Sequence, residues 1–277
     1  MTIDRYLAEP SLAQLIIVNN ASSDGTTDYL EQLKHSEPRL WVINEPCNLG
    51  GAGGFHQGIK TARERATTDW LVISDDDSFP EQGALTDFSA IVPKLHPQCG
   101  WVASQVRYPE GGLCSMNEPM KFPSLGSAIS RLFKRQKITW DPSQDGQELA
   151  KIDGSSFVGM FVKRATLQQT QVLPISDYFI YWDDIAFCYD LVRQGAVGQY
   201  TSQLTFIHDC DRHTKSLREQ RLYYMVRNGI WTMAKLPISK RVWAMPFKLI
   251  SWLMIAIKSQ SLSWYVQAVK HAAQRRT

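Results

Sequence analysis

Short apolar runs alternate with helical segments over residues 15–77, and this rhythm restricts the chain to an α/β fold. The sequence predicts strands at 15–18, 40–43 and 70–74 and helices at about 27–34 and 55–66. A strand–helix–strand repeat of this kind builds a Rossmann-like, mostly parallel sheet with helices on both faces. The first fourteen residues are predicted to be helical, with apolar positions at Ile3, Tyr6, Leu7 and Leu12.

The rest of the chain divides at about residue 210. A helix near 85–95, strands at 101–106, 157–162 and 204–208, and a helix ending near 194 continue the α/β pattern. Residues 107–150 are rich in Pro, Gly, Ser and Lys and predict a long irregular excursion. We therefore expect a catalytic domain over 1–210, followed by a basic, amphipathic helical region over 211–277.

Charge and cysteine content restrict the cellular compartment and the kinds of partner that the chain is expected to have. The net charge is +3, yet residues 211–277 alone hold 13 Lys and Arg against 2 Asp and Glu. The five cysteines form no CxxC pair, and no secretory signal opens the chain, so we expect a reduced cytoplasmic protein. The basic region lacks a recognisable nucleic-acid-binding motif, which argues against a nucleic-acid partner.

The basic region contains an apolar segment, Val242–Ile257, that is shorter than the ~20 residues needed to span a bilayer. One interpretation is a helix lying on the inner face of the cell membrane, held by interfacial aromatics and flanking cations. The other is a helical pair packed on the catalytic domain with the aromatics as core. The aromatic residues concerned are Trp243, Trp252, Trp264 and Tyr265.

Three adjacent carboxylates, Asp75, Asp76 and Asp77, follow a predicted buried strand. Residues two apart in extended chain point the same way, so Asp75 and Asp77 are able to share one hard cation, Mn²⁺ or Mg²⁺, while Asp76 faces elsewhere. The carboxyl end of a strand in an α/β sheet is also where ligands commonly bind. The alternative is a solvated acidic turn.

Four glycines, Gly50, Gly51, Gly53 and Gly54, follow Asn48 before a predicted helix. The spacing matches neither a dinucleotide fingerprint nor a P-loop, because His56 and Ile59 stand where those motifs need Gly and Lys. A tight strand–loop–helix setting would direct backbone N–H groups at an anion. A flexible loop is the alternative.

Two further features carry candidate chemistry. Trp182, Asp183 and Asp184 combine an aromatic face with paired carboxylates, one of which is able to act as a general base; the alternative is a helix start that favours acids. His208 ends a predicted strand and is a candidate ligand for Mn²⁺ beside carboxylates, with His213 as a weaker rival. Taken together, these features suit transfer from a nucleoside diphosphate.

Over residues 15–230 the chain resembles the inverting GT-A glycosyltransferases of family 2. The segment from Ile17 to Thr26 resembles the family's nucleotide-proximal turn, Asp75–Asp77 its DxD-type metal motif, and Trp182–Asp184 its acceptor-side acidic pair. Arg221 to Asn228 also recurs there. The loop from Asn48 to Phe55, with a histidine after the acidic pair, is more specifically similar to bacterial galactofuranosyltransferases.

The resemblance implies a role for each residue. Asp75, Asp77 and His208 would bind the divalent metal, Asp184 would deprotonate the acceptor hydroxyl, and Trp182 and Asp183 would bind the acceptor. The nucleotide-sugar donor would contact a larger set: Asn19, Asn20, Ser22, Asp24, Asn48, Gly50, Gly51, Gly53, Gly54 and Asp76.

The implied reaction is metal-dependent transfer of galactofuranose from UDP-galactofuranose, with inversion, to a cell-surface polysaccharide or lipid-linked glycan. A rhamnosyltransferase using a dTDP-sugar is the enzyme alternative. Two departures from the family stand out, namely Asn19 in place of its usual aspartate and the expected absence of its first strand. They leave open a non-catalytic sugar- or membrane-binding remnant.

Overall fold

The structure is a computed structural model that describes residues 2–121, 148–210 and 218–274. Its central sheet has the strand order β3-β7-β5-β8-β4, with β6 also paired to β8. The strands are β3 (Trp70–Ile73), β4 (Ser78–Pro80), β5 (Cys99–Arg107), β6 (Ala150–Ile152), β7 (Met160–Lys163) and β8 (Val197–His208).

The central sheet is mixed, so the expectation of a mostly parallel sheet was wrong. β5 pairs in parallel with β8, whereas the pairs β3–β7, β5–β7, β4–β8 and β6–β8 are antiparallel. Parallel neighbours need a long crossover, usually a helix. The strand predicted at 157–162 corresponds to β7, although its antiparallel pairing was not predicted. The short strands β4 and β6 were not predicted from the apolar pattern.

A second, two-stranded parallel sheet comprises β1 (Leu15–Asn19) and β2 (Leu40–Asn44), connected by α2 (Thr26–Ser36). Ahead of it lies α1 (Thr2–Leu7), so the helix predicted near the start is confirmed, and the described residues contain no strand before β1. The carboxylate of Glu9 caps α4 (Ala84–Ile91) by accepting hydrogen bonds from Gly83 and Leu85 backbone N–H groups.

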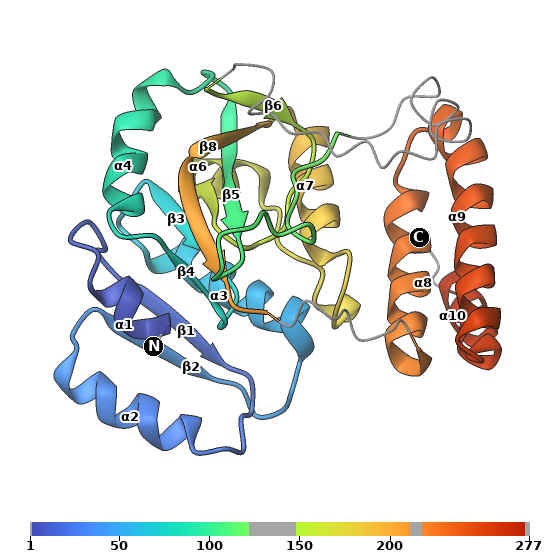
Figure 1. The fold of residues 1–277 in the computed structure, drawn as a ribbon, viewed down its shortest axis with the longest axis horizontal. Helices are drawn as coiled ribbons and strands as arrows, with labels where there is room; N and C mark the ends of the chain where they lie inside the picture. The colour runs from blue at the N-terminus through green and yellow to red at the C-terminus, as the bar shows by residue number, and fades with distance from the viewer. Residues whose placement is uncertain (1, 122–147, 211–217, 275–277) are drawn as a thin grey trace.

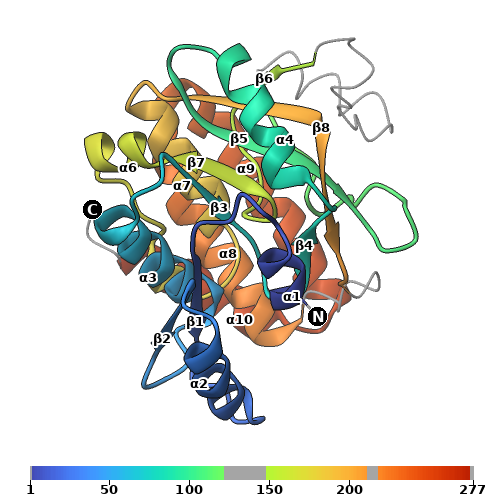
Figure 2. The ribbon, with the colours of Figure 1, turned by 90° about the vertical axis from the view of Figure 1, so that its left-hand side faces the viewer.

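Helices cover both faces of the central sheet, as the sequence predicted (Figures 1 and 2). α1 and α4 pack on one face around Val102 and Phe161, and the opposite face buries Trp101 and Met160. Neighbouring residues of one strand point to opposite faces, which explains this division. The helices on the second face are α3 (Gly50–Arg65), α6 (Arg164–Thr170) and α7 (Asp183–Arg193).

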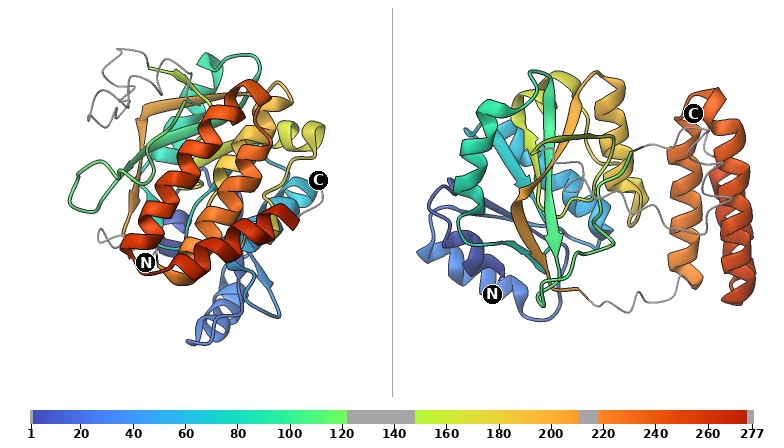
Figure 3. Two further views of the ribbon diagram at one scale, coloured as in Figure 1. Left: turned by 90° about the vertical axis from the view of Figure 1, so that its right-hand side faces the viewer. Right: turned by 45° about the horizontal axis from the view of Figure 1, so that its top comes forward.

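The C-terminal helices α8 (Glu219–Ala234), α9 (Ile238–Lys258) and α10 (Leu262–Gln274) form a separate layer beside the sheet region (Figures 1 and 3). Their core includes Leu222, Val226 and Trp252, and Trp252 is only 3% exposed. Tryptophan therefore serves here as core, which supports the packed-helix interpretation. Among the described residues, no helix is both long and apolar enough to cross a membrane.

Candidate active site

The structure brings together the three residues that the resemblance assigned to a metal. β4 pairs with β8 in a register that sets Ser78 opposite His208, and this draws the acidic turn after β3 against the end of β8. His208 Nε2 lies 3.1 Å from Asp77 Oδ1 and 4.0 Å from Asp75 Oδ2. Potential ligand atoms of all three residues lie within 4.8 Å of one another. Asp76 is exposed and lies outside this cluster.

The donor set fits a divalent cation. Asp77 Oδ1 is buried and accepts no hydrogen bond of good geometry from the described residues, despite the nearby imidazole. Burial, together with the neighbouring acids, raises the pKa of Asp75 to about 6 against the opposing effect of His208. An unsatisfied carboxylate oxygen, a second carboxylate and an imidazole are a suitable set for Mn²⁺ or Mg²⁺.

The imidazole of His208 is fixed from both sides. Burial opposes its charging, but the nearby carboxylates of Asp77 and Asp75 and the thiol of Cys114 raise its pKa to about 10. Nδ1 lies 2.8 Å from Asn117 Oδ1, and the Asn117 amide nitrogen donates to Ser156 Oγ at 2.7 Å. Donation from Nδ1–H to Asn117 leaves Nε2 as the nitrogen that is able to bind a metal.

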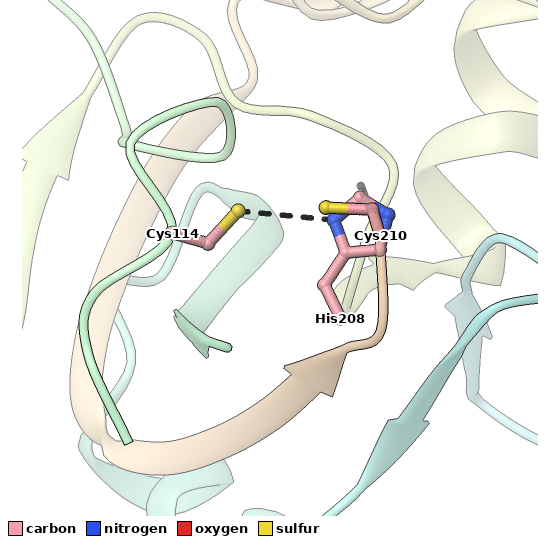
Figure 4. Close-up of side chains that lie close together, drawn as sticks. All are labelled: Cys114, His208 and Cys210. Atoms are coloured by element: carbon pink, nitrogen blue, oxygen red, sulfur yellow. Dashed lines mark hydrogen bonds between the residues drawn. The ribbon is translucent and has the colours of Figure 1, made fainter. Parts of the chain in front are cut away.

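The imidazole of His208 also belongs to a second cluster, together with the thiols of Cys114 and Cys210 (Figure 4). Cys114 Sγ lies 3.9 Å from His208 Nδ1 and 2.9 Å from Asn117 Oδ1. Because Asn117 already occupies Nδ1, we assign the thiols to the surroundings of His208 rather than to a second metal site. Asn117 and Cys114 were not predicted, since they lie in the segment expected to be irregular. His213 lies outside the described residues.

Asp183 and Asp184 open α7, after a loop with an unusual backbone. Phe179, Tyr181 and Trp182 have φ values of 65°, 69° and 68°, a region that non-glycine residues seldom adopt. Burial raises the pKa of Asp183 to about 6, and burial together with the charge of Asp183 raises that of Asp184 to about 8. The charge of Asp75 also contributes to the raised pKa of Asp184. The two acidic clusters therefore lie close enough for their charges to influence each other.

Helix α8 holds this strained loop in place. The side-chain amide of Asn228, which is fully buried, donates to the carbonyl oxygens of Tyr178, Ile180 and Tyr181 at 2.8, 2.8 and 3.0 Å. Arg227 donates to the carbonyl of Asp177 at 2.6 Å. These two α8 residues are part of the resemblance to the family, and in the structure they support the loop that precedes Asp183 and Asp184.

The glycine-rich segment also contacts this loop. It is the first part of α3, which begins at Gly50, so the predicted loop before a helix at 55–66 was wrong. Gly50 has φ +69°, and a Cβ there would lie 2.1 Å from the carbonyl oxygen of Phe179. The same oxygen accepts a hydrogen bond from Ala52 N–H at 3.1 Å. At least one backbone N–H at the start of α3 therefore donates to a carbonyl of the protein and is not available to bind an anion.

The residues assigned to the donor divide into two groups. Asn20 bridges to the start of α3: its amide accepts from Leu49 N–H at 2.8 Å and donates to the Gly50 carbonyl at 2.9 Å. Asn48 accepts from Gly50 N–H at 2.8 Å. These contacts connect the end of β1 to the Phe179 loop and hence to the acidic site.

The other group lies in the turn after β1. Asn19 is buried, and its amide bonds to Thr27, Asn44 and Ser22 N–H. Ser22 and Asp24 are exposed, and the Asp24 carboxylate accepts hydrogen bonds from both N–H and Oγ1 of Thr26 at the start of α2. These contacts give Asn19 and Asp24 clear structural roles, and their donor contacts stay a prediction.

Trp182 is half-buried between the loop and the C-terminal layer. Its indole N–H donates to the Met225 carbonyl at 3.0 Å, and its ring meets Trp252 edge-on with centroids 6.1 Å apart. These contacts anchor the residue before Asp183 to α8 and α9. Stacking of Trp182 on an acceptor sugar stays a prediction.

We expect Asn228→Ala to lower kcat by about tenfold to a hundredfold with little change in the donor KM, because the loop that precedes Asp184 loses three hydrogen bonds and shifts. Steady-state kinetics at saturating metal would measure this. Met233→Ala, on the same helix but directed into the C-terminal core, is the matched control for simple loss of stability. Equal losses of kcat in the two variants would contradict a positioning role for Asn228.

The chain is similar in sequence to curated galactofuranosyltransferases. Galactofuranosyltransferase GlfT1 of Mycobacterium tuberculosis is 25% identical over 211 residues, which cover 76% of this chain and 65% of that protein. GlfT1 of Mycolicibacterium smegmatis is 25% identical over 198 residues, covering 71% and 61%. The chain thus spans less than two thirds of the length of these curated relatives.

Solved structures share the fold. The mannosyltransferase PcManGT of Pyrobaculum calidifontis, in complex with GDP-Man and Mn²⁺, has a TM-score of 0.54 at 16% identity and covers 100% of this chain and 71% of its own. S. aureus TarS 1–349, in complex with UDP, has a TM-score of 0.54 at 13% identity and covers 86% and 63%. These likenesses establish a GT-A fold.

The family model described as "Glycosyl transferase family 2" matches residues 2–147, which is more than half of the chain and includes the acidic turn after β3. The chain therefore belongs to glycosyl transferase family 2.

Proposed function

We propose that this chain is a metal-dependent, inverting galactofuranosyltransferase that uses UDP-galactofuranose. The observation that carries the proposal is the convergence of Asp75, Asp77 and His208 with the acidic start of α7. The similarity to two GlfT1 proteins supports the choice of donor. We further propose residues 1–210 as the catalytic domain and 211–277 as a membrane-facing helical region at the cytoplasmic side.

Asp75, Asp77 and His208 Nε2 would hold the divalent cation, Mn²⁺ or Mg²⁺. Bound there, the cation would neutralise the charge of a departing nucleoside diphosphate. No side chain then needs to protonate the leaving group, in contrast to the two-carboxylate requirement of a glycoside hydrolase. A single base is sufficient on the acceptor side.

Asp184 would supply that base. Its carboxylate takes the proton of the acceptor hydroxyl while the hydroxyl oxygen bonds to the anomeric carbon, and the bond from that carbon to the diphosphate oxygen breaks on the opposite face. Inversion follows from this single displacement. A base with a pKa near 8 is well matched to an alcohol at neutral to mildly alkaline pH.

The test is a donor screen with the purified chain, Mn²⁺ and a lipid-linked or oligosaccharide acceptor. We expect nucleotide release and a glycosylated product with UDP-galactofuranose, and neither with Asp184→Asn. Turnover only with dTDP-rhamnose would contradict the proposed donor and favour the rhamnosyltransferase alternative. Failure of every donor would favour a non-catalytic sugar- or membrane-binding remnant.

A further inference from the structure

Helix α9 presents a row of apolar side chains to solvent, which we call the α9 stripe. Its six members are each between 55% and 68% exposed: Ile238, Val242, Phe247, Ile250, Met254 and Ile257. Their spacing of three to five residues is close to the helical period, and from the first to the last the helix rises about 28 Å. Single exposed apolar residues are ordinary, but six of them within about half of the circumference of one helix, at 100° per residue, indicate a binding surface.

The α9 stripe is not the core face of the helix. Ala244, Trp252 and Ala256 of α9 are buried in a cluster with residues of α8 and α10. α8 lies between α9 and the sheet region (Figure 1), so α9 is an outer helix of the layer. The sequence placed the interfacial role on the tryptophans. The structure instead buries Trp252 and exposes the aliphatic residues and Phe247.

The charges around the α9 stripe have one sign. α9 and α10 together contain Lys240, Arg241, Lys248, Lys258 and Lys270, and neither helix contains an aspartate or glutamate. Lys240 and Lys258 lie near the two ends of α9, flanking the stripe along its length. An apolar stripe flanked by cations complements a surface that is apolar inside and anionic at its edge.

We propose that the α9 stripe docks on an anionic lipid bilayer, with α9 lying in the plane of the headgroup–acyl boundary. A second copy of the chain fits less well, because a symmetric contact would place two basic, acid-free surfaces against each other. The described part of the chain has no helix suited to crossing the bilayer, so the contact is one of surface insertion. This inference deepens the membrane-facing role proposed above for residues 211–277, and it does not depend on the transfer reaction.

The test uses the full chain and sedimentation with vesicles in the absence of donor and metal. Vesicles of phosphatidylcholine with one quarter phosphatidylglycerol should bind the protein at least about tenfold more tightly than pure phosphatidylcholine. Ile250→Glu/Met254→Glu should weaken binding to the anionic vesicles by at least about tenfold. Ile250→Ser/Met254→Ser adds no charge and should also weaken vesicle binding. This variant separates the loss of apolar insertion from the repulsion between glutamates and anionic lipid.

The matched control is Gln32→Glu/Gln82→Glu, which adds the same charge at exposed positions of the sheet region and should leave vesicle binding unchanged. All variants alter exposed side chains, and their unfolding midpoints should match that of the parent. Failure of the parent chain to bind anionic vesicles would overturn the proposal. So would a vesicle-free dimer that the stripe substitutions convert to monomer, since the stripe would then be an interface between copies.

Discussion

Asp184→Asn should lower the rate of sugar transfer by at least about a thousandfold while leaving donor affinity within about threefold of the parent. The amide has nearly the shape of the carboxylate, and its oxygen is able to keep the hydrogen bond that Asp184 accepts from Ile185 N–H at 2.7 Å. It cannot accept a proton from the acceptor. Single-turnover kinetics together with a donor-binding titration would separate the two effects.

Asp190→Asn is the control for this substitution, because Asp190 is another acid of α7 whose carboxylate pairs with Lys235 instead. It should retain near-parental transfer. If Asp184→Asn instead abolished donor binding, Asp184 would belong to the donor or metal site, and the acceptor-side base would have to be sought elsewhere.

Asp184→Asn should also stabilise the protein at pH 8. The folded-state pKa of Asp184 lies near 8, above the ordinary value of 3.8 for an aspartate. The folded protein therefore holds more protons than the unfolded chain between these values, and stability falls as pH rises through that window. Asparagine removes this penalty. A gain of about 2 kcal/mol would raise the unfolding midpoint at pH 8 by roughly 4–8 °C, with little change at pH 4.

Thermal unfolding of the parent and the variant at the two pH values would test this point. A destabilised variant at pH 8 would show that the ionised Asp184 is well satisfied in the folded protein. It would also contradict the interpretation that the charged, buried Asp184 lowers folding stability in exchange for catalytic activity.

The local pattern of the sequence was sufficient for most elements. β1, β2, β3 and α2 lie within two residues of their predicted bounds, because each is a short apolar run or a helix with clear turn residues at its ends. α3 was placed five residues too late, since four glycines among five residues argue against a helix locally. Contacts with Asn20 and the Phe179 loop compensate for that low propensity.

The site was predictable in part. The sequence alone indicates Asp75, Asp77 and His208 as candidate metal ligands, and the β4–β8 pairing explains why residues so far apart in sequence meet. The support around them was not predictable. Asn117 contacts His208 across a segment with no regular pattern, and Asn228 reaches three carbonyls of a loop about fifty residues earlier. Such long-range polar contacts leave no periodicity in a single sequence.

Binding of Mn²⁺ should release about one proton from His208 at pH 7.5. Without an ion, Asp77 and Cys114 overcome the effect of burial and hold the pKa of His208 near 10, so the imidazole is protonated at that pH. A metal needs the neutral ring, and the cation therefore displaces the Nε2 proton. Apparent affinity should rise close to a hundredfold from pH 6.5 to pH 8.5, since each pH unit lowers the competing proton concentration tenfold.

Calorimetric titration of the chain with Mn²⁺ in two buffers of different ionisation enthalpy would count the released protons. His208→Ala should abolish the release and weaken Mn²⁺ binding by about a hundredfold, whereas His35→Ala, at an exposed position of α2, should change neither. Binding that is independent of pH and of His208 would mean that the ion is held by the carboxylates alone. The imidazolium would then serve as a fixed positive charge beside Asp77, and His208 would not belong to the metal-binding residues.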